Sequence, residues 1–132
     1  MMLKKCLLVL FLSLMFANPI KAEVNNQDKS VVYYFHGNKR CSSCMKIEKY
    51  TKNTVEKNFK NKVDLRIVNV DLGENSHFIS DYNIYSKAVV LVKMVNGKKV
   101  DYKNLDKIWY HISNQDKFES YVKTEIEDFL LK

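Results

Sequence analysis

The sequence has one proline and no apolar run long enough to span a membrane. Pro19 is the only proline among the 132 residues, so a chain that begins after position 22 cannot contain a cis-prolyl bond. The longest apolar stretch, residues 6–17, covers about 12 positions. A membrane-spanning helix needs roughly 20. This shortfall disfavours a spanning segment and directs attention to export.

The first 22 residues have the organisation of a secretory signal peptide. Lys4 and Lys5 form a basic start, the apolar stretch 6–17 follows, and the small residue Ala22 ends the segment. This order is typical of a signal that is removed after export, and we predict cleavage after Ala22. Retention as an uncleaved anchor is the alternative. The expected location is periplasmic or extracellular, and Cys6 is discarded with the signal.

The charge pattern disfavours a nucleic-acid partner. The whole chain has a formal net charge of +7, and loss of the signal leaves 19 basic and 15 acidic side chains, a net charge of +4. Lysines alternate with acidic residues, and no basic cluster of the kind that follows a phosphate backbone is present. The remaining 110 residues suffice for one domain. We predict a flexible leader at 23–30 and one domain at 31–132.

After removal of the signal only two cysteines remain, Cys41 and Cys44. A disulfide between residues three apart closes a very small loop, so it constrains the unfolded chain little compared with a long-loop disulfide and is poorly placed as a structural staple. An exported protein meets an oxidising compartment. The spacing therefore indicates redox chemistry or metal ligation.

Runs of β-branched and aromatic residues alternate with helical patterns along the domain. Asn96-Gly97 predicts a tight hairpin. Phe78 and Ile79 are expected to face inward, and Trp109 and Tyr110 to belong to the core. We predict strands at 31–35, 63–71, 88–95 and 98–102, helices at 41–60, 77–82 and 115–131, and a short helical turn within 105–112. This order predicts an α/β fold with a mixed central sheet of about four strands flanked by helices.

Three segments in this order resemble the thioredoxin superfamily. The first is the strand 31–35, a short loop, and Cys41-Ser42-Ser43-Cys44 at the start of a helix. The second is 68–71, a short helix, and 82–84. The third is the strand 89–92, the Asn96-Gly97 turn and the last helix. The resemblance covers 31–132. It implies a thioredoxin-like fold and thiol–disulfide exchange at the cysteine pair.

The sequence departs from the family pattern near the cysteines. Family members usually carry a cis-proline before the third matching strand, where this chain has Ala88, or Lys87 if the alignment shifts by one. They also often bury an aspartate beneath the second cysteine, where this chain has Phe35 or Tyr34. The family's tryptophan-containing approach to the motif is replaced by residues 36–40. The chain thus resembles a divergent branch, and the resemblance makes Ala88 a site-lining residue.

The position of Cys41 at a helix start suits a reactive thiolate. Unpaired backbone N–H groups and the helix dipole point at its sulfur, and Lys39 and Arg40 add positive charge. These effects are expected to lower the pKa of Cys41 and make it the attacking thiol. Cys44, one turn further along, is expected to be more buried and to resolve the mixed disulfide. His36 is interpreted either as a proton-steering group or as an ordinary loop residue.

Cys41 and Cys44 are the predicted catalytic residues. The predicted site-lining residues are Ser42 and Ser43, which lie between the two cysteines in the sequence, and His36, Arg40 and Ala88. The favoured function is an exported thiol–disulfide oxidoreductase without a cofactor. It would act on a protein thiol or disulfide, be regenerated by a second redox partner, and have no stable membrane insertion after cleavage.

Two other functions stay open from the sequence alone. One is a module that binds or delivers copper(I) or zinc through the two thiolates, although a closed zinc site needs four ligands and only His36 suggests a third. The other is a non-catalytic thioredoxin-like interaction domain with an inert disulfide.

Overall fold

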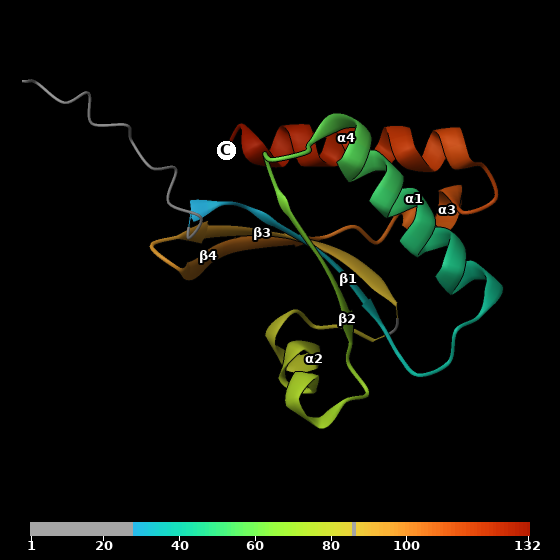
Figure 1. The fold of residues 1–132 in the computed structure, drawn as a ribbon, viewed down its shortest axis with the longest axis horizontal. Helices are drawn as coiled ribbons and strands as arrows, with labels where there is room; N and C mark the ends of the chain where they lie inside the picture. Colours follow the sequence, from blue (N-terminus) through green and yellow to red (C-terminus); the bar gives the residue numbers. More distant parts are fainter. Residues whose placement is uncertain (1–27, 86) are drawn as a thin grey trace, which may run out of the picture.

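The computed structural model describes residues 28–85 and 87–132 (Figure 1). The predicted signal peptide at 1–22 lies outside the described residues, as does most of the predicted leader. In chain order the elements are β1 (Val31–His36), α1 (Ser42–Asn58), β2 (Asp64–Asn69), the 3-10 turn η2 (Gly73–Asn75), α2 (His77–Asp81), β3 (Ala88–Val95), β4 (Lys98–Asn104), α3 (Ile108–His111) and α4 (Gln115–Leu130). The short helical turn expected within 105–112 is α3.

β1 lies inside a four-stranded sheet with the order β2-β1-β3-β4. It pairs in parallel with β2, with Val31 opposite Asp64, and antiparallel with β3, with Phe35 opposite Ala88. Parallel neighbours need a long crossover connection, and α1 supplies it. The predicted mixed sheet of about four strands flanked by helices is confirmed.

β3 and β4 form the predicted hairpin. Val95 lies opposite Lys98, and the intervening Asn96 and Gly97 have φ angles of 52° and 75°. Positive φ at both central positions is what a tight hairpin turn requires, and an Asn-Gly pair adopts it at little cost. The backbone N–H of Asn96 donates to Asp28 Oδ1 at 2.6 Å, so the chain just before β1 contacts this turn.

α1 and α4 cover one face of the sheet, with α3 beside them (Figure 1). Side chains alternate along a strand, so Val32 and Tyr34 of β1 point toward these helices. Between the layers lie Ile47 from α1 and Phe118 from α4, both fully buried. Burying such side chains contributes about 2 kcal/mol each, which fixes α1 and its first turn against the sheet.

The opposite face of the sheet is aromatic and is covered by the short helix α2 (Figure 1). The rings of Tyr33 and Phe35 stack with centroids 4.9 Å apart. The ring centroid of Phe78 lies 5.4 Å from that of Tyr33, and the ring centroid of Tyr82 lies 5.7 Å from that of Phe35. Aromatic side chains bury large areas each. A five-residue helix therefore suffices to cover this face.

Three side chains that the pattern placed inward are exposed. Ile79 is 43% exposed, Trp109 41% and Tyr110 81%, so these expectations were wrong. α2 and α3 have only five and four residues. Over so short a stretch, the spacing of apolar residues does not determine which side of a helix faces the core.

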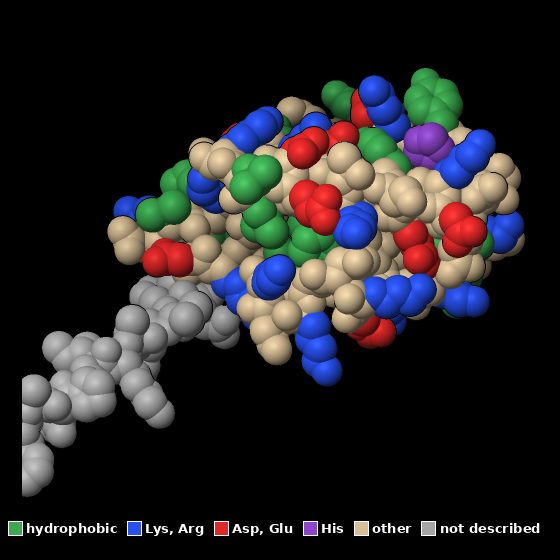
Figure 2. Space-filling model, turned by 90° about the horizontal axis from the view of Figure 1, so that it is seen from above, with side chains coloured by type: hydrophobic (Ala, Val, Ile, Leu, Met, Phe, Trp, Pro, Cys, Tyr) green, Lys and Arg blue, Asp and Glu red, His purple; other side chains and the backbone are tan. Residues whose placement is uncertain are grey.

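The described part of the surface carries interspersed charges. Figure 2 shows basic and acidic side chains mixed over the helical face, without an area dominated by one sign. Among residues 28–85 and 87–132, no helix has both the length and the apolar character needed to cross a membrane.

Substitution of Ile126 by alanine tests the helical face of the core. Ile126 is 1% exposed in α4, and removing its side chain leaves a cavity, so Ile126→Ala should lower the free energy of unfolding by about 2–5 kcal/mol. The exposed Thr124 of the same helix is the matched control. Thr124→Ala should change the free energy of unfolding by less than about 0.5 kcal/mol. Urea unfolding measures both. Equal losses would contradict this packing.

Candidate functional site

The two cysteines form a disulfide at the first turn of α1. β1 ends at His36, the loop 37–40 follows, and Cys41 is the N-cap residue of α1. Cys41 is bonded to Cys44, with their Cα atoms 5.0 Å apart. Cys41 is exposed, whereas Cys44 has no exposed surface. Of the two, Cys41 is therefore the cysteine that solvent can reach.

The helix N-terminus surrounds Cys41 with positive potential. The backbone N–H of Cys44 donates to Cys41 Sγ at 3.1 Å, and the first turn of α1 contains no acidic side chain. Free N–H groups and the helix dipole favour an anion at this position. In the reduced protein the same arrangement favours a Cys41 thiolate, which is the nucleophilic form of the sulfur.

Arg40 is held to α1 by an ion pair. Its guanidinium contacts Glu48 Oε2, and Lys52 Nζ lies 3.2 Å from Glu48 Oε1. Burial disfavours the charged form of Glu48, but hydrogen bonds from Lys52 and Arg40 outweigh it and lower the pKa of Glu48 below its ordinary 4.5. Glu48 thus balances much of the positive charge that the sequence assigned to Arg40. The pair fastens the loop before Cys41 to the helix.

A buried tyrosine lies beneath Cys44. Tyr34 has no exposed surface, and its hydroxyl donates to the backbone carbonyl of Cys44 at 2.9 Å. Burial raises the pKa of Tyr34 to about 12, so the hydroxyl stays protonated near neutral pH. Phe35 points to the opposite, aromatic face of the sheet. Of the two residues that the sequence offered for the position beneath the second cysteine, Tyr34 is the one in contact with it.

Hydrogen bonds join the loop before Cys41 to the end of β2. The backbone N–H of Asn38 donates to Asp71 Oδ2 at 2.7 Å, and Asn69 Nδ2 donates to Asn38 Oδ1 at 2.8 Å. Gly37 leaves room for this carboxylate, since a Cβ there would lie 2.6 Å from Asp71 Oδ2. Sequence reasoning missed Asp71 and Asn38 as site residues. The available signal was that polar residues follow two strands whose parallel pairing brings their ends together.

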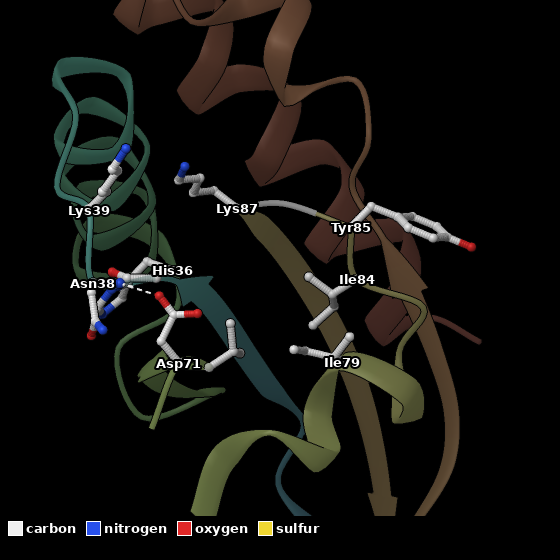
Figure 3. Close-up of a pocket in the computed structure, with 10 residues that line it drawn as sticks. His36, Asn38, Lys39, Asp71, Ile79, Ile84, Tyr85 and Lys87 are labelled. Atoms are coloured by element: carbon white, nitrogen blue, oxygen red, sulfur yellow. Dashed lines mark hydrogen bonds between the residues drawn. The ribbon is translucent and has the colours of Figure 1, made fainter. Parts of the chain in front are cut away.

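A cleft of about 420 Å³ opens beside this loop (Figure 3). His36, Lys39 and Asp71 form part of its polar wall, and Ile79 and Ile84 form part of its apolar wall. His36 Nδ1 lies 2.8 Å from the carbonyl oxygen of the next residue, an arrangement that requires the proton on Nδ1. His36 is thus oriented by the loop backbone at the wall of the cleft.

The other predicted site residues occupy two different faces. Ser42 and Ser43 open α1 and share its first turn with the disulfide, Ser42 exposed and Ser43 half-buried. Ala88 begins β3 opposite Phe35, is 6% exposed, and belongs to the aromatic cluster on the sheet face away from α1. Its neighbour Lys87, and not Ala88, is among the residues that line the cleft.

Ligands for a metal ion are few around the cysteines. In the part of the chain that the structure describes, no group of three or more His, Cys, Asp or Glu side chains is placed to hold one. A four-ligand site built on the two sulfurs of the reduced protein would therefore need ligands from elsewhere.

The strand order and the position of the disulfide identify the fold. A central strand pairs in parallel with the second strand and antiparallel with the third, helices flank both faces, and a Cys-x-x-Cys disulfide opens the helix after the first strand. The fold is thioredoxin-like. The predicted thioredoxin-like fold is confirmed.

Solved structures of thioredoxins are similar to this chain at low sequence identity. Fasciola hepatica thioredoxin is 21% identical over 68% of this chain and 84% of that chain, with a TM-score of 0.45. Trypanosoma brucei brucei thioredoxin is 16% identical over 77% and 79%, with a TM-score of 0.48. Oxidized thioredoxin O2 from Arabidopsis thaliana is 19% identical over 70% and 76%, with a TM-score of 0.46. No protein-family model matches the chain, and no curated protein matches it significantly.

Glu48→Gln should weaken the acid dependence of stability. Because the pKa of Glu48 is lowered in the folded state, its contribution is fully present above its ordinary pKa and is lost as the pH falls through the folded value. The free energy of unfolding should therefore fall more steeply in the wild type than in the variant between about pH 5 and about pH 3. Urea unfolding at several pH values measures the slopes. Glu56→Gln, on an exposed residue of the same helix, should keep the wild-type slope, and a Glu48→Gln variant that also kept it would contradict the prediction.

Gly37→Ala should destabilise the protein through Asp71. The new Cβ would displace the Asp71 carboxylate and break its hydrogen bond with the Asn38 N–H, at a cost of about 1 kcal/mol. In an Asp71→Ala background, where that bond is already absent, the same substitution should cost much less. Urea unfolding of the four proteins in this double-mutant cycle isolates the coupling between the two sites. An equal cost in both backgrounds would refute the contact.

Proposed function

We propose that the protein is an exported thiol–disulfide oxidoreductase that exchanges disulfides with protein partners through Cys41 and Cys44. The observation that carries the proposal is the asymmetry of the pair: Cys41 is exposed at a helix N-terminus, and Cys44 is buried behind it. Export rests on the signal-like residues 1–22, and an exported Cys-x-x-Cys pair meets an oxidising compartment.

In the oxidised protein the reaction begins at Cys41. A partner thiolate attacks Cys41 Sγ, the Cys41–Cys44 bond breaks, and Cys44 leaves with the electron pair and takes up a proton. A second partner thiolate then attacks the partner sulfur of the mixed disulfide and releases Cys41 as a thiolate. The partner gains a disulfide, and the pair is reduced by two electrons.

In the reduced protein the same steps run in reverse. The Cys41 thiolate attacks a partner disulfide and expels one partner sulfur as a thiolate. Deprotonated Cys44 then attacks Cys41 Sγ, restores the intramolecular disulfide and releases the second partner sulfur. The partner gains two thiols, and the direction in the cell depends on the reduction potential and on the recycling partner.

The surroundings of Cys44 suit the resolving role. The Tyr34 hydroxyl fixes the Cys44 carbonyl at 2.9 Å and so holds this turn of α1 in place. Cys44 Sγ lies 3.8 Å from the carbonyl oxygen of Lys39, which can accept a weak hydrogen bond from the thiol after reduction. Burial and this acceptor both favour the neutral Cys44 thiol, so the Cys41 thiolate is the first nucleophile of the reduced pair.

Serine substitutions separate the two roles, with Cys6 also replaced by serine so that no third thiol contributes. Cys41→Ser should abolish exchange with bis(2-hydroxyethyl) disulfide, because the remaining thiol is buried. Cys44→Ser should still attack and should accumulate an adduct on Cys41, because no resolving thiol is present. Stopped-flow exchange rates and intact-protein mass spectrometry measure the two effects.

The Cys6→Ser protein with both site cysteines is the control. Its Cys41 pKa, measured from alkylation rates against pH, should lie below the ordinary value of about 8.5. An ordinary Cys41 pKa, together with no exchange with bis(2-hydroxyethyl) disulfide, would refute the redox function. Tight stoichiometric metal in the reduced protein would support the metal-binding alternative instead.

A further inference from the structure

One apolar side chain interrupts the polar face of α1. Met45 is 52% exposed, and within α1, all of which the structure describes, it is the only large apolar side chain that is exposed. Ile47 and Val55 of the same helix are buried against the sheet, as the amphipathic pattern of a surface helix requires. The core therefore gives no reason for a methionine at position 45, and thiol–disulfide exchange at the two sulfurs does not need one.

Met45 lies one helical turn from Cys41. Its backbone N–H donates to the carbonyl oxygen of Cys41 at 3.0 Å, as expected when the N-cap carbonyl accepts the first bond of a helix. Long side chains on a helix lean toward its N-terminus, so the thioether of Met45 lies over the turn that begins with Cys41. Cys41 is itself exposed. A partner segment whose sulfur reaches Cys41 therefore passes close to Met45.

The surroundings of Met45 suit an apolar contact. Glu48 follows three positions later, and its carboxylate is already paired with Arg40 and Lys52. An apolar side chain placed on Met45 would thus not leave the Glu48 charge without a partner. Methionine is unbranched and polarizable, so it adapts to the shape of the side chain that covers it. Covering its exposed surface removes apolar area from water, which favours binding.

The spacing of Cys41 and Met45 indicates which partner position meets the methionine. Four residues of α-helix advance about 6 Å along the axis. In an extended segment, side chains two positions apart point to the same side and lie about 6.6 Å apart. An extended partner whose cysteine meets Cys41 therefore brings the side chain two positions away over Met45. The side chains directly beside the partner's cysteine point to the opposite side.

We propose that Met45 is a specificity-determining residue, which selects partner segments that carry an apolar side chain two positions from the reacting cysteine. The inference rests on the proposed exchange function, for which it defines the class of partner. That class is an extended segment in which an apolar side chain and the reacting cysteine share one face. The apolar contact supplies binding, and Cys41 supplies the chemistry.

Two peptides of identical composition test this selectivity. Each carries one cysteine, capped as a neutral 2-hydroxyethyl disulfide, together with two leucines and two glutamines. In the first peptide the leucines stand two positions from the cysteine on either side and the glutamines stand next to it. In the second peptide the leucines and glutamines are exchanged. The protein is the full chain with Cys6→Ser and Cys44→Ser, so that Cys41 is its only thiol.

The reaction forms one disulfide and breaks another. The Cys41 thiolate attacks the peptide sulfur, forms a Cys41–peptide disulfide and expels the cap as a thiolate, which takes up a proton. Attack on the cap sulfur gives an adduct of different mass, and intact-protein mass spectrometry separates the two products. The measured quantity is the ratio of the initial rates at which the two peptide adducts form. Because the same thiolate attacks both peptides, changes in its reactivity cancel from this ratio.

The protein should prefer the first peptide about three- to tenfold, the range expected when one apolar side chain is partly buried. Met45→Gln should lower the ratio to near unity, whereas Met45→Leu should keep it because leucine is also apolar. Both replacements are good helix formers, so α1 should be preserved. Val100→Gln is the matched control, since Val100 is 55% exposed in β4, and it should keep the ratio.

The outcomes separate this inference from the proposed function. If the Cys6→Ser protein with both site cysteines did not exchange with bis(2-hydroxyethyl) disulfide, the function itself would be refuted. Normal exchange with that small disulfide, but equal rates for the two peptides, would refute only the selectivity. A preference that persists in Met45→Gln, or that is lost in Met45→Leu or Val100→Gln, would overturn the assignment to Met45.

Discussion

β1 is hydrogen-bonded along both edges and covered on both faces. β2 and β3 take its edges, α1 and α4 cover one side, and α2 covers the other. Because Val31–Phe35 are all buried, the strand has no freedom to shift its register, since a shift by one residue would exchange its two faces. The fixed end of β1 determines where the loop 37–40 emerges. That loop then delivers Cys41 to the N-terminus of α1.

The same end of the sheet gathers the polar groups of the site. The parallel partner β2 ends beside β1, so Asp71 meets the loop before Cys41. The antiparallel partner β3 starts there, which brings Lys87 to the other wall of the cleft. Tyr34, two residues before the end of β1, reaches up to the turn that carries Cys44. The site is therefore a consequence of strand pairing more than of the cysteine motif alone.

Much of the fold could be predicted because its signals are local. The apolar run at 31–35, the Asn96-Gly97 turn and the long amphipathic pattern of the last helix each specify a structure within a few residues. The cysteine spacing and its place after a strand likewise predicted a helix N-terminus at Cys41. The sequence of a short helix does not determine which of its sides faces the core. Ile79 and Trp109 were therefore predicted to be buried but are exposed.

The contacts that tune the site join distant parts of the chain. Asn38 and Asp71 are 33 residues apart, and only the pairing of β1 with β2 brings them together. Arg40 forms an ion pair with Glu48, which lies two turns along α1. This contact exists only because the loop before Cys41 folds back on the helix. The choice between Tyr34 and Phe35 beneath Cys44 likewise required knowing which face of β1 turns toward α1.

The disulfide lies within a single helical turn, between residues three apart. Opening so small a loop changes the entropy of the unfolded chain less than opening a long loop would, and the main core clusters are built without it. Reduction should therefore lower the resistance to unfolding and proteolysis less than the loss of a long-loop disulfide would. A redox partner of the kind proposed would therefore have to contact the sulfur at the helix tip to distinguish the oxidised from the reduced protein.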